Sequence, residues 1–366
     1  MNTSVTEPVA HQRVAWTAAE LHQNQDWVYQ ISAEAAAQLL QAVRAGHQPG
    51  RDLLDYQAAD FPLGAVLETL QAAFKQVRDG RGLTLVKGLP REGVSPQEFE
   101  LMTWVIGLHF GVARPQDRYT RYINMVKDVG VNYRSPTGRG YSSNAELDFH
   151  VDGSDVVLLS CYNQAPEGGM SMCTSSIKAY EVMCAERPDL AQVLTTDFPF
   201  SRNGEQPPQE ALWFRAPLVG FEEGHTFCVW NRNRLMNALK IEGVPPLTAL
   251  QAEAVGYLDA VVRRPDLMYC MYLEAGDLQI LSNQTVLHSR TSFEDHTDEE
   301  KRRTLYRLWL AMPDSCRLPA GWDGYTGSCA PATVRGGTKG HQYDARCQAF
   351  DQRQAKAMGM KLAAMT

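Results

Sequence analysis

The sequence predicts a mainly β protein with flanking helices, built around a double-stranded β-helix (jelly-roll) core. Three features of the chain lead to this prediction. Helical patterns dominate the first 110 residues, short strand-like runs separated by turn residues begin at about residue 120, and helical patches interrupt those runs between residues 179 and 264. Short strands with turns at such intervals are typical of sandwiches and jelly rolls.

Composition narrows the class of protein further. The chain has 366 residues, is 44% hydrophobic and 21% charged, and carries a formal net charge of −7 with scattered basic residues, which argues against a nucleic-acid partner. No apolar run approaches the roughly 20 residues needed to cross a bilayer, and the polar start of the chain is unlike a signal peptide. The eight cysteines have irregular spacing and no CxxC pair, so we expect a reducing, cytoplasmic location. Oligomeric state stays open, and a homo-oligomer is compatible with the sequence.

The N-terminal region, residues 1–110, is expected to be mainly helical. Residues 1–30 show little periodicity and are expected to form an extended arm. Apolar periodicity, serine caps and glycine stops then predict three helices, and a glycine-bounded apolar run predicts one buried strand. The helices are expected at 32–45 after Ser32, at 66–78 before Gly80 and at 95–110 before Gly111, and the strand at 82–88.

The catalytic core is expected at residues 111–315, with a lid-like insertion at about 179–264 and a C-terminal tail at 316–366, all within a single catalytic domain. Glycine-containing turns such as 166–169 and 274–277 separate the predicted strands. These strands are expected at 119–126, 156–162, 226–230, 268–273, 278–281 and 303–312. Helices are expected at 179–185 and 248–263 in the insertion and at 345–362 in the tail.

Two histidines and one aspartate are the candidate functional residues. His150 and Asp152 stand two positions apart, so on a strand both side chains point to the same face. His288 lies far downstream, ahead of a basic run that includes Arg303 and Arg307. Two imidazoles and one carboxylate on one face of an ion leave three coordination positions open, which is the facial triad of non-haem Fe(II) oxygenases.

In motif order, residues 80–312 resemble the taurine dioxygenase-like (TauD/TfdA) branch of the Fe(II)- and 2-oxoglutarate-dependent oxygenases, to which clavaminate synthase is related. That pattern is His-x-Asp/Glu, a Gly-Gly turn followed by a hydroxyl residue, an Asn shortly before a distal His, and Arg-x-x-x-Arg. This sequence supplies His150-x-Asp152, then Gly168-Gly169-Met170-Ser171, then Asn283 to His288, and finally Arg303-x-x-x-Arg307.

The resemblance implies a clavaminate synthase-like jelly roll and a role for each matching residue. It implies that His150, Asp152 and His288 bind Fe(II), and that Arg303 and Ser171 bind the distal carboxylate of 2-oxoglutarate. Arg307 matches a position that contacts substrate or cosubstrate, and Asn283 belongs to the same cofactor-binding set. The cofactors expected are therefore Fe(II), 2-oxoglutarate and O₂.

The substrate is less well defined by the sequence. Glu146 stands where the taurine enzyme has a substrate-binding Asn, and the basic run follows His288 at a longer interval than in the family. Tyr133, Arg134, Trp213 and Arg215 are candidates for lining the substrate pocket.

The expected reaction is oxidative decarboxylation of 2-oxoglutarate to succinate and CO₂, coupled to C–H oxidation of a small substrate. Hydroxylation, desaturation and cyclisation can all use the same iron site. Arg307 suggests a substrate that carries a carboxylate, such as an amino acid. Two alternatives stay open: a jelly-roll metallohydrolase that uses Zn(II) to activate water, and a non-catalytic jelly roll that binds a small molecule.

Overall fold

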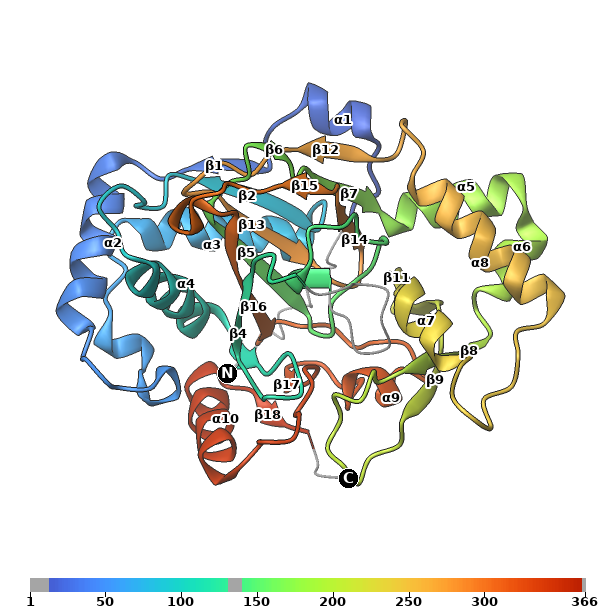
Figure 1. The fold of residues 1–366 in the computed structure, drawn as a ribbon. Coiled ribbons are helices and arrows are strands. Elements are labelled where there is room, and N and C mark those ends of the chain that lie inside the picture. The colour runs from blue at the N-terminus through green and yellow to red at the C-terminus, as the bar shows by residue number, and fades with distance from the viewer. Residues whose placement is uncertain (1–12, 131–139, 364–366) are drawn as a thin grey trace, which may run out of the picture.

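Two facing sheets form the centre of the computed structural model, which describes residues 13–130 and 140–363 (Figure 1). The main sheet has the order β1-β2-β13-β5-β16-β3, and β4 also pairs with β16. Its pairs are antiparallel except for β1 with β2. The strands are β1 (Val28–Gln30), β2 (Leu83–Lys87), β3 (Val112–Arg114), β4 (Ile123–Val126), β5 (Val156–Asn163), β13 (Leu278–Ser282) and β16 (Thr304–Ala311).

The second sheet is smaller and has the antiparallel order β12-β7-β14. Its strands are β12 (Tyr269–Met271), β7 (Ser171–Ser175) and β14 (Val286–Arg290), and the short pair β6 (Glu167–Gly168) and β15 (Phe293–Glu294) continues beside it. Side chains from both sheets share one buried apolar cluster, with Val157, Leu281 and Leu305 from the main sheet and Cys173 and Val286 from the smaller one. Two sheets closed over a common core form a jelly roll, so the predicted fold class is confirmed.

Helices cover the outer face of the main sheet. They are α2 (Ala33–Gly46), α3 (Val66–Asp79), α4 (Pro96–Phe110) and, from the far end of the chain, α10 (Ala345–Met358). Leu39, Leu70 and Ile106 pack in one cluster with Leu158 and Leu308 of the sheet. Because helices cover one face and the smaller sheet the other, β16 is buried at every position and β5 at all positions except Leu159 and Asn163.

The predicted helices at 32–45, 66–78 and 95–110 are confirmed, with Ser32 and Ser95 capping the first and third. The prediction of an extended arm over residues 1–30 is wrong for residues 18–30, which form α1 (Ala18–Gln23) and then β1. Residues 1–12 of this arm lie outside the described residues. Thr17 and Glu20 form a capping box that starts α1, and β1 pairs with β2, a partner more than fifty residues away. Short single-turn helices occupy η1 (Leu53–Asp55), η2 (Ala58–Asp60), η3 (Gly140–Ser142) and η4 (Glu299–Lys301).

The segment between β7 and β12 forms a body with its own apolar cluster, to which Met183, Phe198 and Leu258 contribute. Its helices are α5 (Ser176–Glu186), α6 (Pro188–Val193), α7 (Arg232–Ala238) and α8 (Ala249–Val262). Two antiparallel hairpins lie among these helices, and the sequence predicted one of their four strands, at 226–230. These hairpins are β8 (Asp197–Ser201) with β9 (Trp213–Pro217), and β10 (Val219–Glu222) with β11 (His225–Cys228).

The C-terminal segment, residues 313–363, returns to the core rather than leaving it. It contains α9 (Asp323–Thr326), then β17 (Thr333–Val334) paired with β18 (Lys361–Leu362), with α10 between them. The predicted helix at 345–362 ends early, because Gly359 adopts a left-handed conformation that terminates α10. Among the described residues, no helix combines the length and apolar character needed to cross a membrane.

Candidate active site

Two backbone segments bring the candidate metal ligands together. A strand was expected around His150, but this residue is not part of a regular strand. It forms isolated bridges to His288 on β14 and to Asn231 on its other side. The His150 N–H donates to the His288 carbonyl at 3.0 Å, and the return bond measures 2.9 Å. The next two N–H groups are also bonded, that of Val151 to the Trp230 carbonyl at 2.8 Å and that of Asp152 to Asn283 Oδ1 at 3.0 Å, which fixes the backbone between the two candidate ligands.

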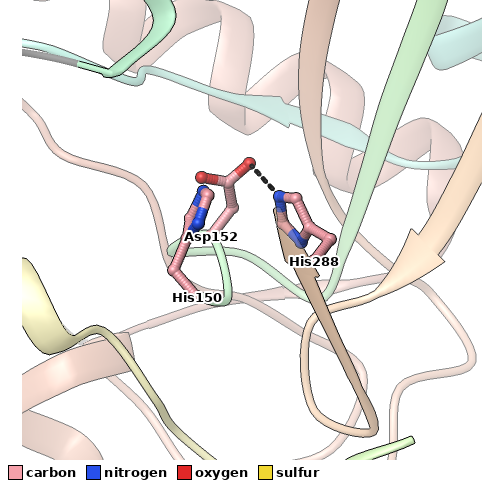
Figure 2. A group of neighbouring side chains, drawn as sticks. All are labelled: His150, Asp152 and His288. Carbon is pink, nitrogen blue, oxygen red and sulfur yellow. Dashed lines mark ion pairs between the residues drawn. The ribbon is translucent and has the colours of Figure 1, made fainter. Parts of the chain in front are cut away.

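Figure 2 shows the three side chains converging on one point. One potential ligand atom from each of His150, Asp152 and His288 lies within 4.8 Å of the others. His150 Nδ1 lies 2.9 Å from the Asp148 carbonyl, which can only accept, so its proton is on Nδ1 and Nε2 is left with a lone pair. His288 Nε2 lies 3.8 Å from Asp152 Oδ2.

The protonation states of this cluster suit a metal ion. Burial lowers the pKa of His150, and it lowers the pKa of His288 to about 3. Burial alone would raise the pKa of Asp152, but the Arg307 guanidinium and the histidines hold it below its usual value. Asp152 Oδ2 is buried with no hydrogen-bond partner in the part of the chain that the structure describes. Two neutral imidazoles around an unsatisfied carboxylate oxygen fit a divalent cation such as Fe(II).

Arg303 has an unusual environment for an arginine. Its side chain is buried next to the cluster, and Nη1 has no partner among the described residues. Its guanidinium lies over the Phe293 ring, and burial lowers its pKa to about 10. Asp295 acts on this charge, but no ion pair joins the guanidinium to a carboxylate among the described residues. A buried guanidinium without a directly paired anion is costly, so this geometry fits an anionic ligand such as the distal carboxylate of 2-oxoglutarate.

The Gly-Gly turn explains how Arg303 is accommodated. Gly169 has φ +71°, and a Cβ there would lie 2.8 Å from Arg303 Nε. Ser171, two residues on, lines the same cavity and donates its hydroxyl to Gln279 Oε1 at 3.1 Å.

Arg307 and Asn283 contact the Asp152 segment directly. Arg307 Nη1 lies 3.3 Å from Asp152 Oδ1, and its Nε donates to Gln116 at 2.8 Å. Asn283 does not line the cavity. Its Oδ1 accepts the Asp152 N–H at 3.0 Å.

Several residues that line the cavity could not be found by motif matching. Gln279 is the one polar residue in the buried run from Leu278 to Leu281 of β13, which is a usable sequence signal. Among the described residues, the other polar side chains that line the cavity outside the motif positions are Tyr141, Asn203, Asn231, Asn233, Arg234, Ser289 and Arg290.

The substrate candidates from the sequence lie elsewhere. Glu146 is exposed and pairs with Arg263 at 2.9 Å. Trp213 and Arg215 stack on each other at 5.4 Å, and neither lines the cavity. Tyr133 and Arg134 lie outside the described residues.

A jelly roll with two histidines and one carboxylate, beside a buried arginine that lacks an anion, defines the class of Fe(II)- and 2-oxoglutarate-dependent oxygenases. Residues 47–309 match the taurine catabolism dioxygenase TauD, TfdA family. The chain belongs to this family, and the predicted enzyme class and cofactors are confirmed.

Comparisons with individual proteins agree with this family. FR-33289 synthase of Streptomyces rubellomurinus is 27% identical over 84% of this chain and 91% of its own length. A taurine hydroxylase-like protein of Stachybotrys chartarum is 24% identical over 84% of this chain and 81% of its own. Among solved structures, an asparagine oxygenase with Fe(II), 3-hydroxyasparagine and succinate superimposes with a TM-score of 0.59 at 18% identity, covering 82% of this chain and 98% of that one. The oxygenase OrfP with Fe and α-ketoglutaric acid gives 0.57 at 16% identity, covering 78% and 94%.

Proposed function

We propose that His150, Asp152 and His288 hold Fe(II), that Arg303 anchors 2-oxoglutarate, and that the enzyme oxidises a C–H bond of a small anionic, amino-acid-like substrate. The observation that carries this proposal is the buried Arg303 guanidinium, which lines the same cavity as the three candidate ligands. When bound, Fe(II) and 2-oxoglutarate supply the oxidising power by activating O₂ as the oxo acid is converted to succinate and CO₂.

Arg303 recognises the cosubstrate by charge and shape. A guanidinium binds a carboxylate through two parallel hydrogen bonds, and in a buried site this pairing compensates for the loss of water around both groups. Gly169 leaves room for the arginine. The Ser171 hydroxyl, fixed by Gln279, adds a polar group on the same side of the cavity.

Arg307 and Asn283 are assigned to positioning rather than to direct cosubstrate binding. Arg307 keeps the Asp152 carboxylate ionised and oriented through its 3.3 Å contact. Asn283 fixes the Asp152 backbone. Groups that orient ligands in this way typically influence metal affinity 10- to 100-fold.

The charge of the cavity supports an anionic substrate. Among the described residues, four arginines (Arg234, Arg290, Arg303 and Arg307) line it, and Asp152 is the one lining carboxylate. Glu205 neutralises one of them by pairing with Arg234 at 3.1 Å. Fe(II) and a 2-oxoglutarate dianion together add no net charge, so a positive excess remains for the substrate.

The part of the cavity lining that comes from the insertion is rich in amides. Asn203, Asn231 and Asn233 belong to it together with Arg234. Asn203 has φ +54°, a conformation that is uncommon outside glycine and asparagine and is frequent at functional sites. Amides and a guanidinium suit the carboxylate and polar groups of an amino acid. The solved relatives hold 3-hydroxyasparagine, hydroxyarginine and homoarginine, which is in keeping with this class.

Oxygen-dependent succinate release, screened over a panel of amino acids and their anionic analogues, tests the proposal. We expect release to require Fe(II), O₂ and 2-oxoglutarate and to rise with an anionic substrate. Arg234→Gln should raise the KM for that substrate about 10-fold or more with little effect on the KM for 2-oxoglutarate. Arg232→Gln is the matched control, because Arg232 lies on the same helix outside the cavity lining. Product formation with Zn(II) and no 2-oxoglutarate would instead establish a hydrolase.

A further inference from the structure

The C-terminal segment lies beyond the family match, which ends at residue 309, yet it contacts the loop that carries the proposed carboxylate ligand. This Asp152 loop, residues 152–155, is not part of a regular strand. Backbone bonds of Asp155 to Leu310 and Asn283, at 3.1 and 3.0 Å, fix its far end, whereas Asp152 and Gly153 depend on other contacts. The Tyr325 hydroxyl donates to the Asp152 carbonyl at 3.1 Å. The Gly337 N–H donates to the carbonyl of Gly153.

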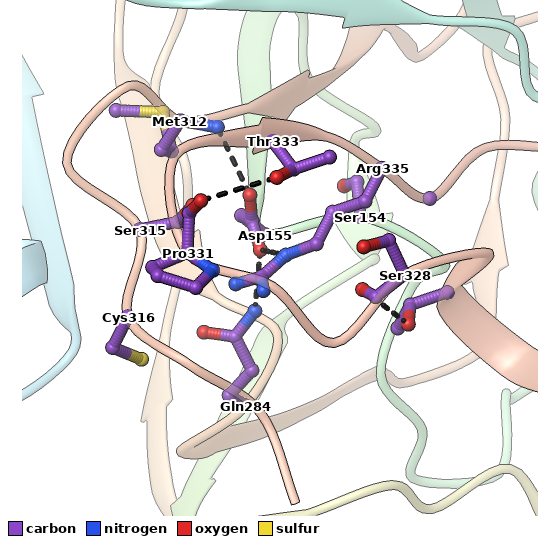
Figure 3. Close-up of polar contacts among 12 residues, drawn as sticks. Ser154, Asp155, Gln284, Met312, Ser315, Cys316, Ser328, Pro331, Thr333 and Arg335 are labelled. Atoms are coloured by element: carbon purple, nitrogen blue, oxygen red, sulfur yellow. Dashed lines mark hydrogen bonds and ion pairs between the residues drawn. The ribbon is translucent and has the colours of Figure 1, made fainter. Parts of the chain in front are cut away.

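Asp155, at the end of the loop, connects three parts of the chain (Figure 3). Its Oδ1 accepts from Arg335 Nε at 2.8 Å and from Gln284 Nε2 at 2.9 Å. Its Oδ2 accepts from the Met312 N–H at 2.9 Å. The carboxylate is 4% exposed, so every one of these bonds is shielded from water. It ties the loop to the end of β16, to the turn before β14 and to the C-terminal segment.

Arg335 is equally buried, at 2% exposure, and its Nη1 also donates to the Ala330 carbonyl at 3.0 Å. A buried ion pair contributes little net stability over apolar packing, and its best-attested use is to specify one geometry. The neighbouring Gly336 supports such a use. It has φ +72°, and a Cβ there would lie 2.5 Å from the Gly153 carbonyl oxygen. The close approach of the C-terminal segment to the loop therefore requires glycine.

We infer that the C-terminal segment is a positioning element of the metal centre, in which Arg335 and Tyr325 hold the Asp152 loop in the conformation that binds the ion. This inference rests on the proposed role of Asp152 as a ligand. The carboxylate receives its orientation from its own backbone, and that backbone is held on one side by Asn283 and on the other by Tyr325. Loosening either side spreads the carboxylate over several orientations and weakens metal binding.

The test is the dissociation constant for Fe(II), measured anaerobically on the full chain at a temperature where circular dichroism shows each variant folded. Arg335→Lys keeps the charge, but an ammonium cannot reproduce the planar group that contacts both the Asp155 carboxylate and the Ala330 carbonyl. We expect Fe(II) to bind 10- to 100-fold more weakly to this variant. Tyr325→Phe removes one hydroxyl, and we expect about a fivefold loss. The 2-oxoglutarate chelate band of both variants should shift or broaden relative to the wild type.

Asp351→Asn is the matched control. Asp351 forms another buried ion pair of the same segment, with Arg114 Nη1 at 2.8 Å. Its link to the Asp152 loop is indirect, through the bond from Arg114 Nε to the Gly336 carbonyl at 3.2 Å, which Asp351→Asn leaves in place. The substitution should lower the melting temperature and leave the Fe(II) affinity unchanged. If the wild type fails to bind Fe(II), the proposed function is wrong. If the wild type binds and Tyr325→Phe and any folded Arg335→Lys bind equally well, the positioning role is wrong and the segment only stabilises the fold.

Discussion

His150 and His288, separated by 138 positions, pair backbone to backbone through two hydrogen bonds of 3.0 and 2.9 Å, and their rings lie 4.4 Å apart. This bridge joins His150 to β14 of the smaller sheet and therefore sets the spacing of two candidate ligands. Because the backbone fixes this spacing, it does not depend on a metal ion for its formation.

Replacing His288 with Ala should abolish Fe(II) binding in a protein that stays folded, because the backbone bonds of His288 do not involve its ring. Removal of an outer-shell partner costs about 10- to 100-fold in affinity, so loss of a direct ligand should exceed 100-fold. Equilibrium dialysis against Fe(II) measures this. His225→Ala, on β11 and outside the cavity lining, should bind as the wild type does. Undiminished binding in His288→Ala would remove it from the ligand set.

Arg303→Lys should raise the KM for 2-oxoglutarate about 10- to 100-fold, because an ammonium cannot reproduce a two-pronged contact worth about 1.5–3 kcal/mol. Steady-state succinate release at varied 2-oxoglutarate gives the value. Arg302→Lys is the control, since the adjacent side chain is only partly buried and does not line the cavity. Equal effects of the two substitutions would mean that Arg303 has no special role.

The metal-free protein should lose stability in mild acid because of His288. Its pKa is lowered by burial from 6.5 to about 3, so the unfolded chain takes up the proton first. The lowered pKa of His288 therefore contributes to the free energy of unfolding fully above pH 6.5, and this contribution falls as the pH drops toward 3. We expect the free energy of unfolding, measured with urea, to fall between pH 7 and pH 5 in both proteins. The fall should be about 2 kcal/mol smaller in His288→Gln than in the wild type. Identical pH dependence in the two proteins would contradict the lowered pKa.

Packing of α4 on the main sheet predicts a contrast between two glycines. A Cβ at Gly107 of α4 would lie 2.3 Å from Leu308 Cδ2, whereas a Cβ at Gly256 of α8 meets nothing within 4 Å. Gly107→Ala should therefore destabilise the protein by about 1–2 kcal/mol through overpacking. Gly256→Ala should stabilise it by about 0.5–1 kcal/mol through helix propensity. Chemical denaturation of both variants measures the difference, and a stabilised Gly107→Ala would show that α4 packs more loosely than described.

Elements with local signals were predictable from the sequence. The helices α2 and α4 carry their serine caps, apolar periods and glycine stops within their own residues, and β5 is an apolar run long enough to identify alone. The motif order also indicated residues that line one cavity, with Asn283 as the exception. The helix and strand signals depend on neighbours in the chain, so the sequence displays them directly.

Features that depend on distant partners were missed. The strand β1 exists because β2 pairs with it, and the hairpin of β8 and β9 is stabilised by a cluster gathered from across the insertion. The contact from Tyr325 to Asp152 spans 173 positions and leaves no local pattern. The insertion contributes Asn203, Asn231 and Asn233 to the cavity lining. Their position depends on how the insertion folds, and no sequence motif identifies them.

The most direct test of the central proposal is anaerobic titration of the metal-free protein with Fe(II) and then 2-oxoglutarate, followed by visible absorption. The proposed site predicts a weak metal-to-ligand charge-transfer band that needs both components and is absent in His288→Ala. Iron binding without the band would contradict the role of Arg303 and the 2-oxo acid site. If no iron binds at all, the assignment of His150, Asp152 and His288 as a metal centre is wrong.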